Sequence, residues 1–525
     1  MLRTELIRPL PQLLAHHAGR LGGKVAFSDA RRSVSYAALE RRTARLAGHL
    51  AGQGVRRGDR VLIYLGNRVE TAESYLAVTR CSATGVCVNP QSAAAEVGYV
   101  LADSQPAAVI TDEARAGTVR ALLADGGDAL SIPVVAAGAA DGTGASAGPG
   151  TLSYEELAGT DPAAWPRDDL GLDEVAWMLY TSGTTGRPKG VLLTQRSCLW
   201  VVAACWAPIL GLSESDQVLC PLPLFHSYAL DLCVLGVVAT GASEHILDRF
   251  STPEVLKLID GGPYTLLPGV PTMFQYLLHG AGDGPGPATG LRLCVSAGAI
   301  LPAPVNEAFE RVFGVKLLDG YGITETSTMV AMNWPDGGRV LGSCGLPVPG
   351  VGVRLVDTAT GVDVPAGEEG ELWVSGPLLM AGYHNRPEAT AEVLRDGWYH
   401  TGDLARRDPN GFLAITGRIK ELIIRGGENI YPAEVEQVLL GAPGVADAAV
   451  AGCPHPDLGE VPVGFVVPSR PGTLDTGAVL GECRRLLSGF KVPDRLVETD
   501  RIPRTGSGKV LRYQLRERLT GGGEQ

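Results

Sequence analysis

The stretch Tyr180-Thr-Ser-Gly-Thr-Thr-Gly-Arg-Pro-Lys-Gly190 is the most informative part of this sequence, and it directly follows the apolar run Val175-Ala-Trp-Met-Leu179. The apolar run predicts a buried strand that delivers a loop rich in hydroxyl groups. Backbone N–H groups, hydroxyls and one ammonium in such a loop are able to converge on polyphosphate. The loop is not a P-loop, because the GxxxxGK[ST] spacing is absent and Pro188 precedes Lys189 where a helix would begin. A glycine-rich surface turn is the alternative interpretation of this stretch alone.

Length and composition indicate an ordinary globular protein with more than one domain. A chain of 525 residues exceeds the size of a single hydrophobic core, so two or more domains are expected. Apolar residues make up 45% and charged residues 19% of the chain, which is typical of globular proteins. The net charge of −12 argues against non-specific binding of nucleic acid, which requires a basic face.

Neither a membrane span nor a signal peptide is expected from the sequence. The best apolar run, around Leu230–Ala239, is too short to cross a bilayer and is interrupted by Asp231. The first residues carry Glu5 and Pro9 where a signal peptide needs an apolar core. A cytoplasmic location is therefore expected.

The cysteines are scattered through the chain. They form no CxxC pair and no Cys/His cluster at zinc spacing, so reduced, buried thiols are expected rather than disulfides or metal ligands. The ten positions are Cys81, Cys87, Cys198, Cys205, Cys220, Cys233, Cys294, Cys344, Cys453 and Cys483.

Short apolar runs alternate with longer amphipathic stretches through most of the chain. The expected strands include Arg60-Val-Leu-Ile-Tyr-Leu, Ala107-Ala-Val-Ile-Thr, Tyr264-Thr-Leu-Leu-Pro, Leu291-Arg-Leu-Cys-Val-Ser and Val315-Lys-Leu-Leu-Asp. Tyr36–Gly54 has apolar residues at helical spacing. This alternation predicts an α/β fold with mostly parallel sheets covered by helices. Ala136–Gly150 consists almost entirely of small residues and is interpreted as a surface linker.

The character of the sequence changes after residue 345. Val353-Arg-Leu-Val, Glu371-Leu-Trp-Val and Phe412-Leu-Ala-Ile predict short strands of a β subdomain at about 345–417. We place a domain boundary near Lys420, so that residues 1–417 form a large N-terminal domain and 418–525 a small α+β C-terminal domain. The glycine-rich end of the chain is expected to be a disordered tail.

Further motifs follow the first in a fixed order. They are Pro223-Leu-Phe-His226, Ser296-Ala-Gly298, Asp319-Gly-Tyr-Gly-Ile-Thr-Glu325, Tyr399-His-Thr-Gly-Asp403, Gly417-Arg-Ile-Lys-Glu-Leu-Ile-Ile-Arg-Gly-Gly-Glu-Asn429 and Pro503-Arg-Thr-Gly-Ser-Gly-Lys509. This ordered set, from about Leu172 to Lys509, resembles the core motifs of the ANL adenylate-forming enzymes, which include acyl-CoA synthetases, amino-acid adenylation domains and luciferases. The resemblance implies the ANL fold, with a mobile C-terminal domain.

The resemblance also implies the reaction and its cofactors, ATP and Mg²⁺. A carboxylate attacks the α-phosphate of ATP to form an acyl-adenylate and pyrophosphate, and a thiol then displaces AMP. Both steps need positive charge and aligned donors where charge develops. The residues assigned to nucleotide binding are Thr181, Ser182, Gly183, Thr184, Thr185, Lys189, Ser296, Gly298, Asp319, Gly320, Tyr321, Thr324, Asp403 and Arg418.

Individual roles follow from the same resemblance. The loop hydroxyls and Lys189 would wrap the β- and γ-phosphates, and Glu325 would hold Mg²⁺. Asp403 would accept the ribose hydroxyls, Arg418 would assist at the ribose or phosphates, and Tyr321 would stack on adenine.

Lys509 is the expected catalytic cation. In the family this lysine contacts both the substrate carboxylate and the α-phosphate during adenylation. Because it occupies space that the thiol needs, the small domain rotates about a hinge between the two half-reactions, and the hinge position here is Lys420. Many members of the family carry Asp at the hinge position, and both Asp and Lys occur there in the family.

The acid would bind near Phe225-His-Ser-Tyr-Ala-Leu-Asp-Leu232. By resemblance, His226 gates the carboxylate pocket, while Tyr228 and Gly322 belong to its wall. Asp231 lies in an otherwise apolar helix, where a carboxylate is costly unless it is paired. It is either a structural residue paired within the protein or a counter-charge for a substrate ammonium.

Two substrate classes remain open. The counter-charge interpretation of Asp231 resembles stand-alone ligases that adenylate β-amino acids and load the phosphopantetheine thiol of a carrier protein, and we take it as the first expectation. An acyl- or aryl-CoA ligase that uses free CoA is the alternative. A non-catalytic nucleotide-binding relative and a luciferase-like oxygenase are further alternatives; intact Lys189, Glu325, Asp403 and Lys509 argue against the former.

Overall fold

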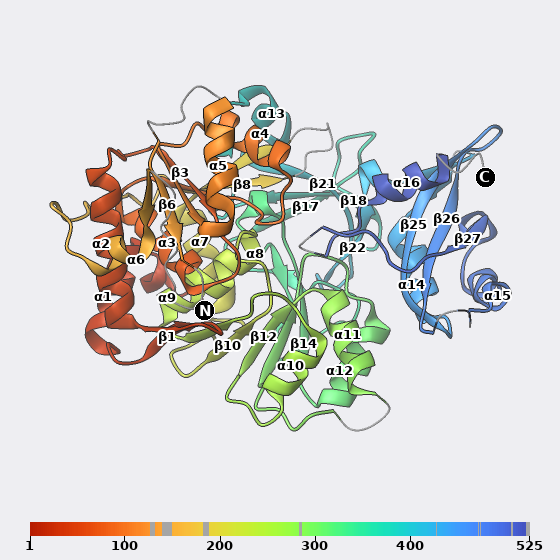
Figure 1. Ribbon diagram of the computed structural model, residues 1–525. Coiled ribbons are helices and arrows are strands. Elements are labelled where there is room, and N and C mark those ends of the chain that lie inside the picture. The colour runs from red at the N-terminus through yellow and green to blue at the C-terminus, as the bar shows by residue number, and fades with distance from the viewer. Residues whose placement is uncertain are drawn as a thin grey trace.

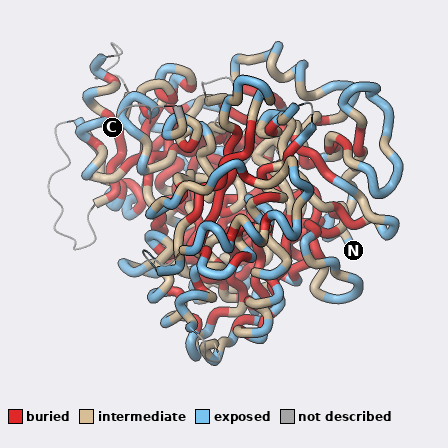
Figure 2. Tube along the Cα trace, turned by 90° about the vertical axis from the view of Figure 1, so that its right-hand side faces the viewer, coloured by how far each residue is buried: buried red, intermediate tan, exposed pale blue. Residues whose placement is uncertain are grey.

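The computed structural model describes residues 1–125, 132–138, 150–181, 188–282, 286–426, 428–470, 472, 474–505 and 508–520. Two large helix-covered sheets and a smaller β sheet precede a C-terminal part with a sheet of its own (Figure 1). The predicted α/β class with parallel sheets is confirmed. Buried residues run through the centre of the molecule and exposed residues cover it (Figure 2).

The first large sheet contains the hydroxyl-rich loop. Its strands, in spatial order, are β19 (Gly382–Tyr383), β9 (Lys189–Thr194), β8 (Val175–Thr181), β4 (Thr84–Cys87), β3 (Arg60–Tyr64), β5 (Ala108–Asp112), β6 (Val134–Ala137) and β7 (Thr151–Ser153). Strands β8 and β9 form an antiparallel hairpin in which Thr181 pairs with Lys189. The loop therefore returns into a strand rather than opening a helix.

The second large sheet carries most of the acid and nucleotide motifs. Its strands, in order, are β16 (Leu346–Pro347), β15 (Ala331–Met332), β14 (Leu317–Tyr321), β13 (Leu293–Ser296), β12 (Leu266–Gly269), β10 (Gln217–Cys220), β11 (Ser243–Ile246), β1 (Val25–Ser28) and β2 (Ser33–Ser35). The strands from β14 to β1 run parallel. The loops after β13 and β14 therefore leave the same edge of the sheet, and this brings Gly298 close to Tyr321 in space.

Helices cover the sheets and fill the space between them. They are η1 (Thr4–Leu6), α1 (Leu10–Arg20), α2 (Tyr36–Gly52), α3 (Val69–Arg80), α4 (Ala94–Ser104), α5 (Glu113–Asp125), α6 (Tyr154–Gly159), α7 (Gln195–Val201), η2 (Val202–Trp206), α8 (Ser227–Ala229), η3 (Leu230–Gly236), α9 (Val237–Thr240), α10 (Thr252–Ile259), α11 (Pro271–Ala281), α12 (Ala303–Phe313) and η4 (Thr324–Thr326). Local signals place their ends: Ser35 caps α2 by accepting from the Ala38 N–H, and α12 ends at Gly314, whose φ is +66°.

Helix α3 is buried along its whole length, and its acidic side chains are neutralised by arginines from other segments. Glu73 is 1% exposed and accepts from Arg42 at 2.6 Å, while Glu70 pairs with Arg68 at 2.7 Å. A buried carboxylate is tolerated when its partner and hydrogen bonds are in place.

The β subdomain is a separate antiparallel sheet. It contains β17 (Gly352–Val356), β18 (Glu369–Ser375), β20 (Leu394–Arg395), β21 (Trp398–Arg407) and β22 (Leu413–Arg418), with α13 (Pro387–Val393) beside it. The C-terminal part follows directly. It contains η5 (Ile419–Glu421), β23 (Ile423–Arg425), β24 (Glu428–Ile430), α14 (Pro432–Gly441), β25 (Val445–His455), β26 (Gly459–Pro468), α15 (Thr476–Leu486), η6 (Gly489–Lys491), β27 (Arg495–Glu498) and α16 (Arg512–Thr520).

One expectation about the chain's organisation was wrong in part. Ala136 and Ala137 belong to strand β6, where they pair with Thr111 and Asp112, rather than to a linker. Small side chains at these positions are fully buried by the sheet's neighbours, and the composition of Ala136–Gly150 concealed this. Residues 139–149 and the terminal 521–525 lie outside the described residues. Within the part of the chain that is described, no helix combines the length and apolar character that crossing a bilayer requires.

Removal of Arg42 tests the burial of α3. Arg42→Ala leaves the Glu73 carboxylate, among the described residues, with Arg32 at 3.6 Å and the Tyr154 hydroxyl at 3.3 Å, and the free energy of unfolding should fall by about 3 kcal/mol. Urea unfolding followed by far-UV circular dichroism measures this change. Arg196→Ala, which removes an exposed pair with Asp173, should cost about 0.5 kcal/mol or less. Equal effects of the two substitutions would contradict the argument.

Candidate active site

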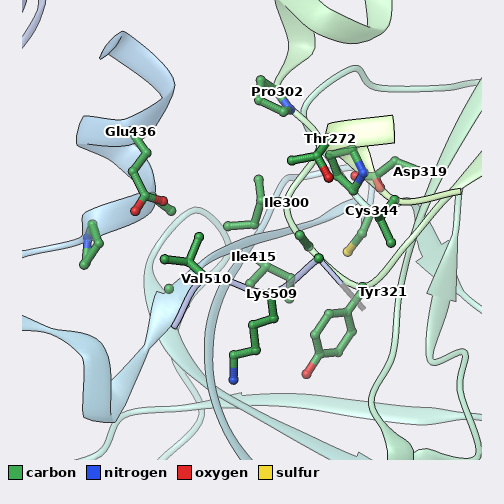
Figure 3. Close-up of a pocket in the computed structure, with 18 of the residues that line it drawn as sticks. Thr272, Ile300, Pro302, Asp319, Tyr321, Cys344, Ile415, Glu436, Lys509 and Val510 are labelled. Atoms are coloured by element: carbon green, nitrogen blue, oxygen red, sulfur yellow. The ribbon is translucent and has the colours of Figure 1, made fainter. Parts of the chain in front are cut away.

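A cleft of about 210 Å³ lies between the C-terminal part and the large domain (Figure 3). Its walls come from the loop after β13, strand β14, strands β21 and β22, and the chain segment before α16. Eight of the residues singled out in the sequence line it: Gly298, Asp319, Gly320, Tyr321, Gly322, Asp403, Arg418 and Lys509. Segments up to about two hundred residues apart therefore meet in one cavity.

A buried carboxylate organises one wall of the cleft. Asp403 is 2% exposed, accepts a hydrogen bond from the Tyr321 hydroxyl and forms an ion pair with Arg418 Nε at 2.6 Å. The pairing of β21 with β22 places Asp403 directly opposite Arg418. Burial raises the pKa of Asp403, and the Arg418 guanidinium opposes that rise. The pair leaves a fixed acceptor for hydroxyl groups at the edge of the cleft.

Lys509 reaches the cleft from a tight turn. The Thr505 N–H donates to the Lys509 carbonyl at 2.7 Å, and Arg504 donates to the Gly508 carbonyl at 3.0 Å while pairing with Asp447. Gly508 has a φ of +82°, and a Cβ there would lie 3.0 Å from Val270 of the large domain. The turn thus has the backbone conformation and the lack of a side chain that this close approach requires.

The Lys509 ammonium lies in a cationic environment. Its Nζ is 4.0 Å from Glu421, which itself pairs with Arg512 at 2.7 Å. Burial, reinforced by the nearby Arg418 guanidinium, lowers the pKa of Lys509. In Figure 3 the Lys509 and Tyr321 side chains extend in the same direction along the cleft. An arriving anion would relieve the repulsion between the two cations.

Direct contacts hold the C-terminal part in this orientation. The side-chain amide of Gln275, at the large-domain wall, donates to the carbonyl of Ala446. Together with the approach of Gly508 to Val270, this contact joins α11 to the C-terminal sheet. Lys420 lies in η5, directly after β22, at the point where the chain leaves the large domain.

A second group of polar residues surrounds the base of the hydroxyl-rich loop. The Lys189 ammonium lies 4.9 Å from the centre of the Tyr383 ring, and the Tyr383 hydroxyl donates to Glu325 Oε1 at 3.0 Å. Burial raises the pKa of Glu325, and among the described residues no lysine or arginine forms an ion pair with it. A half-buried carboxylate that forms no ion pair in the described part of the chain, beside the base of the hydroxyl-rich loop, fits a hard divalent cation such as Mg²⁺. Thr181 ends β8, while Ser182, Gly183, Thr184 and Thr185 lie outside the described residues.

Backbone forms much of the remaining wall. A Cβ at Gly322 would lie 1.1 Å from the Thr328 carbonyl oxygen, and one at Gly320 would lie 2.6 Å from Met332. Burial raises the pKa of Asp319. Among the residues that the structure describes, one Asp319 carboxylate oxygen and the buried Ser296 hydroxyl have no hydrogen-bond partner. At Gly320 and Gly322 the wall beside Tyr321 is therefore packed too closely to hold a side chain. This leaves a flat surface that a planar ring is able to approach.

Of the residues predicted to bind the acid, Gly322 lines this cleft, whereas His226, Tyr228 and Asp231 lie outside its lining. His226 packs against Phe225 with ring centres 4.2 Å apart, and its buried Nε2 has no hydrogen-bond partner in the part of the chain that the structure describes. Burial lowers the pKa of His226 to about 4, so the ring is neutral at neutral pH. The Tyr228 hydroxyl donates to the Val295 carbonyl at 3.1 Å, and Ser227 lies 3.4 Å from Thr324, hydroxyl to hydroxyl. These contacts join the start of α8 to β13 and η4.

Asp231 has a structural partner that the sequence did not indicate. It is 1% exposed in η3, and its Oδ1 accepts from the Trp206 indole N–H at 2.6 Å, whereas its Oδ2 makes no hydrogen bond of ordinary geometry with the described residues. Burial raises the pKa of Asp231 well above its ordinary value, which favours the uncharged acid. Trp206 lies 25 residues away on η2, and no local pattern links the two.

The arrangement described above is matched by known proteins. The family model described as AMP-binding enzyme matches residues 14–384, and the model of the AMP-binding enzyme C-terminal domain matches 434–509. The feruloyl-CoA synthase of Amycolatopsis sp is 38% identical, over 93% of this chain and 94% of that protein. The naringenin synthase of Pestalotiopsis fici is 40% identical, over 96% of this chain but only 19% of its own length. The ATP-bound MatB structure from Rhodopseudomonas palustris is 32% identical with a TM-score of 0.85, covering 97% of this chain and 98% of MatB.

The fold and the cleft define an adenylate-forming enzyme of the ANL type, as the ordered motifs predicted. The chain belongs to the AMP-binding enzyme family.

The neutral state of His226 predicts how the rate of ATP–pyrophosphate exchange depends on pH. Because its pKa is lowered to about 4, the ring stays unprotonated from roughly pH 5 to 8 and contributes no acid limb there. ATP–pyrophosphate exchange measured across this range should give the same pH profile for wild type and His226→Gln, whatever their absolute rates. An acid limb near 6.5 that vanishes in His226→Gln would contradict the buried, neutral ring.

Proposed function

We propose that this protein is an ATP-dependent, AMP-forming ligase that joins an aromatic acid of the 3-arylpropenoic type to free CoA. The placement of Lys509 in one cleft with Asp403, Arg418 and Tyr321 carries the reaction class. The resemblance to a feruloyl-CoA synthase across nearly the whole of both chains supports the acid and the acceptor.

In the first half-reaction a carboxylate oxygen of the acid bonds to the α-phosphorus of ATP and the bond to pyrophosphate breaks. Two anions must approach each other, so the step depends on positive charge at the reacting atoms. Lys509 supplies that charge, since its ammonium lies in the cleft beside the Asp403–Arg418 pair. Burial is the main cause of its lowered pKa and the nearby Arg418 guanidinium adds to it, and bound anionic substrates would oppose this lowering.

The nucleoside is held by the wall around Asp403. The Asp403 carboxylate accepts the ribose hydroxyls, Arg418 keeps the carboxylate charged, and Tyr321 together with the backbone of Gly298 and Gly320 flanks the adenine. The Tyr321 hydroxyl is already donated to Asp403, so the ring is fixed in orientation before the nucleotide arrives.

The terminal phosphates bind at the hairpin tip. Lys189 supplies charge at the base of the loop, and Glu325 would hold Mg²⁺ with the remaining ligands coming from phosphate and water. The ion would neutralise charge on the departing pyrophosphate. Tyr383 links the two residues, because its ring packs on Lys189 and its hydroxyl reaches Glu325.

In the second half-reaction the CoA sulfur bonds to the activated carbonyl, the bond to AMP breaks and the thiol proton is released. Lys509 obstructs the approach, so the C-terminal domain rotates about Lys420. That rotation breaks the hydrogen bond from Gln275 to Ala446 and the contact of Gly508 with Val270. Each of these two is a single local contact.

Asp231 decides between this proposal and a second candidate. An amino-acid ligase that loads a carrier protein needs Asp231 as a charged partner for a substrate ammonium. The Trp206 hydrogen bond and the raised pKa favour a neutral acid, which supports the aromatic substrate. The unpartnered Oδ2 is the observation that favours the amino-acid substrate, so this function remains the second candidate.

Lys509→Ala should separate the half-reactions. Loss of the ammonium should lower ATP–pyrophosphate exchange by about 10²–10³-fold, because charge neutralisation at the α-phosphate is lost. Thioester formation from a supplied acyl-adenylate should change by less than about fivefold. Lys491→Ala, in the same domain but paired with Glu434, is the control and should leave exchange intact. Near-normal exchange in Lys509→Ala would remove this lysine from the mechanism.

A substrate panel tests the acid. Pyrophosphate exchange with arylpropenoic, benzoic, fatty, α-amino and β-amino acids should be fastest with arylpropenoic acids, and free CoA should be preferred to a phosphopantetheinylated carrier protein. Asp231→Asn keeps an acceptor for Trp206 and removes the ionisable group, so kcat/KM for the best aryl acid should change by less than about threefold. Amino acids as the best substrates, lost selectively in Asp231→Asn, would establish the second candidate instead.

A further inference from the structure

Three buried side chains meet between the second large sheet and the helix that follows His226. They are Cys220 at the end of β10, Glu244 in β11 and Cys233 in η3, and one ligand atom from each lies within 4.8 Å of the other two. In the parallel pairing of β10 with β11, Glu244 lies opposite Val218. Because side chains two apart in a strand share a face, Cys220 and Glu244 point to the same side of the sheet.

Among the described residues, the carboxyl group of this cluster has no partner outside the cluster itself. Glu244 is 1% exposed and its oxygens make no hydrogen bond of ordinary geometry there, so the neighbouring Cys220 and Cys233 thiols are the groups that interact with it. The nearby Tyr36 hydroxyl is committed elsewhere, since it is 2.9 Å from the Val237 carbonyl and 2.8 Å from the Ala242 carbonyl. Burial of a carboxyl group without such a partner is costly, so this cluster favours a further ligand.

We propose that Cys220, Cys233 and Glu244 form a zinc site. Two thiolates and one carboxylate are all ligands that Zn²⁺ accepts, and the Leu222 carbonyl oxygen, 3.6 Å from Cys220 Sγ, is within reach as a fourth. The two sulfurs exclude Mg²⁺ and Ca²⁺, which take oxygen ligands, and the carboxylate favours Zn²⁺ over Cu⁺.

Binding of Zn²⁺ would displace protons from its three side-chain ligands. Without the ion, burial raises the pKa of both Glu244 and Cys233, so these groups carry their protons. Zn²⁺ binding would release the protons of the two thiols and the carboxyl group, and the metal would then bond to the freed sulfur and oxygen atoms. No electron transfer is involved.

The position of the cluster indicates a structural role. None of the three residues lines the nucleotide cleft. The metal would tie β10 and β11 to η3, the segment that carries Asp231, and would add to the stability of the large domain. This inference does not depend on the identity of the acid or the thiol.

Metal-dependent refolding tests the proposal, because ligands this deeply buried must be loaded as the chain folds. The full chain is unfolded with a chelator and refolded with Zn²⁺, with Mg²⁺ or without metal; after gel filtration, metal content and the midpoint of thermal unfolding are measured. Refolding in Zn²⁺ should yield about one zinc per chain and a midpoint several degrees higher than in the other two samples. Refolding in Co²⁺ should produce the near-ultraviolet absorption of thiolate–cobalt bonds.

Substitutions localise the metal. Cys220→Ala and Glu244→Gln should lose the bound zinc and the thermal gain, whereas Cys294→Ala, which removes an equally buried thiol from β13, should keep both. Wild-type protein that refolds in Zn²⁺ without retaining the metal would overturn the proposal and make Glu244 a neutral acid among thiols. Zinc retained by both Cys220→Ala and Glu244→Gln would place the metal elsewhere and overturn it as well. If the variants fail to fold, the wild-type result decides.

Discussion

The burial of the Asp403 carboxylate is the constraint on which the active cleft depends. A carboxylate that is 2% exposed needs a cation and a donor, and these come from Arg418 on β22 and Tyr321 on β14. Satisfying one charge therefore joins the β subdomain to the second large sheet. The same pair leaves Lys509 facing a cation, so the cleft is electrostatically prepared for an anion.

A single side chain also links the two large sheets beside the base of the hydroxyl-rich loop. Strand β19, only two residues long, pairs with β9 and so carries Tyr383 to Lys189 and Glu325. Tyr383 thus connects Lys189, at the base of the loop, to the Glu325 carboxylate of η4. Two of the contacts between the C-terminal part and the large domain are of another kind: an amide hydrogen bond and one glycine approach, which a rotating domain is able to make and break.

Much of the cleft was predictable because its residues lie in short motifs whose order along the chain is itself informative. The motifs pointed to Asp403, Arg418, Tyr321 and Lys509, and all four side chains line one cavity. Their partners were not predicted. Gln275, Glu421 and Tyr383 were assigned no role by the motifs, and their importance arises only from contacts across long separations in sequence. Ala136 and Ala137, at the end of strand β6, were assigned to a linker because small residues have weak strand propensity and the sheet, not the local sequence, orders them.

The amino-acid sequence by itself determined the α/β class, the family and the polar groups available for chemistry, since periodicity and motif order are local properties of the chain. Only the tertiary structure decided the state of those groups. It buried Asp231 against Trp206, made His226 neutral, lowered the pKa of Lys509 and gathered Cys220, Cys233 and Glu244 into one cluster. The physical reason is that desolvation and charge–charge interactions depend on distances in space, and residues far apart in the chain set those distances.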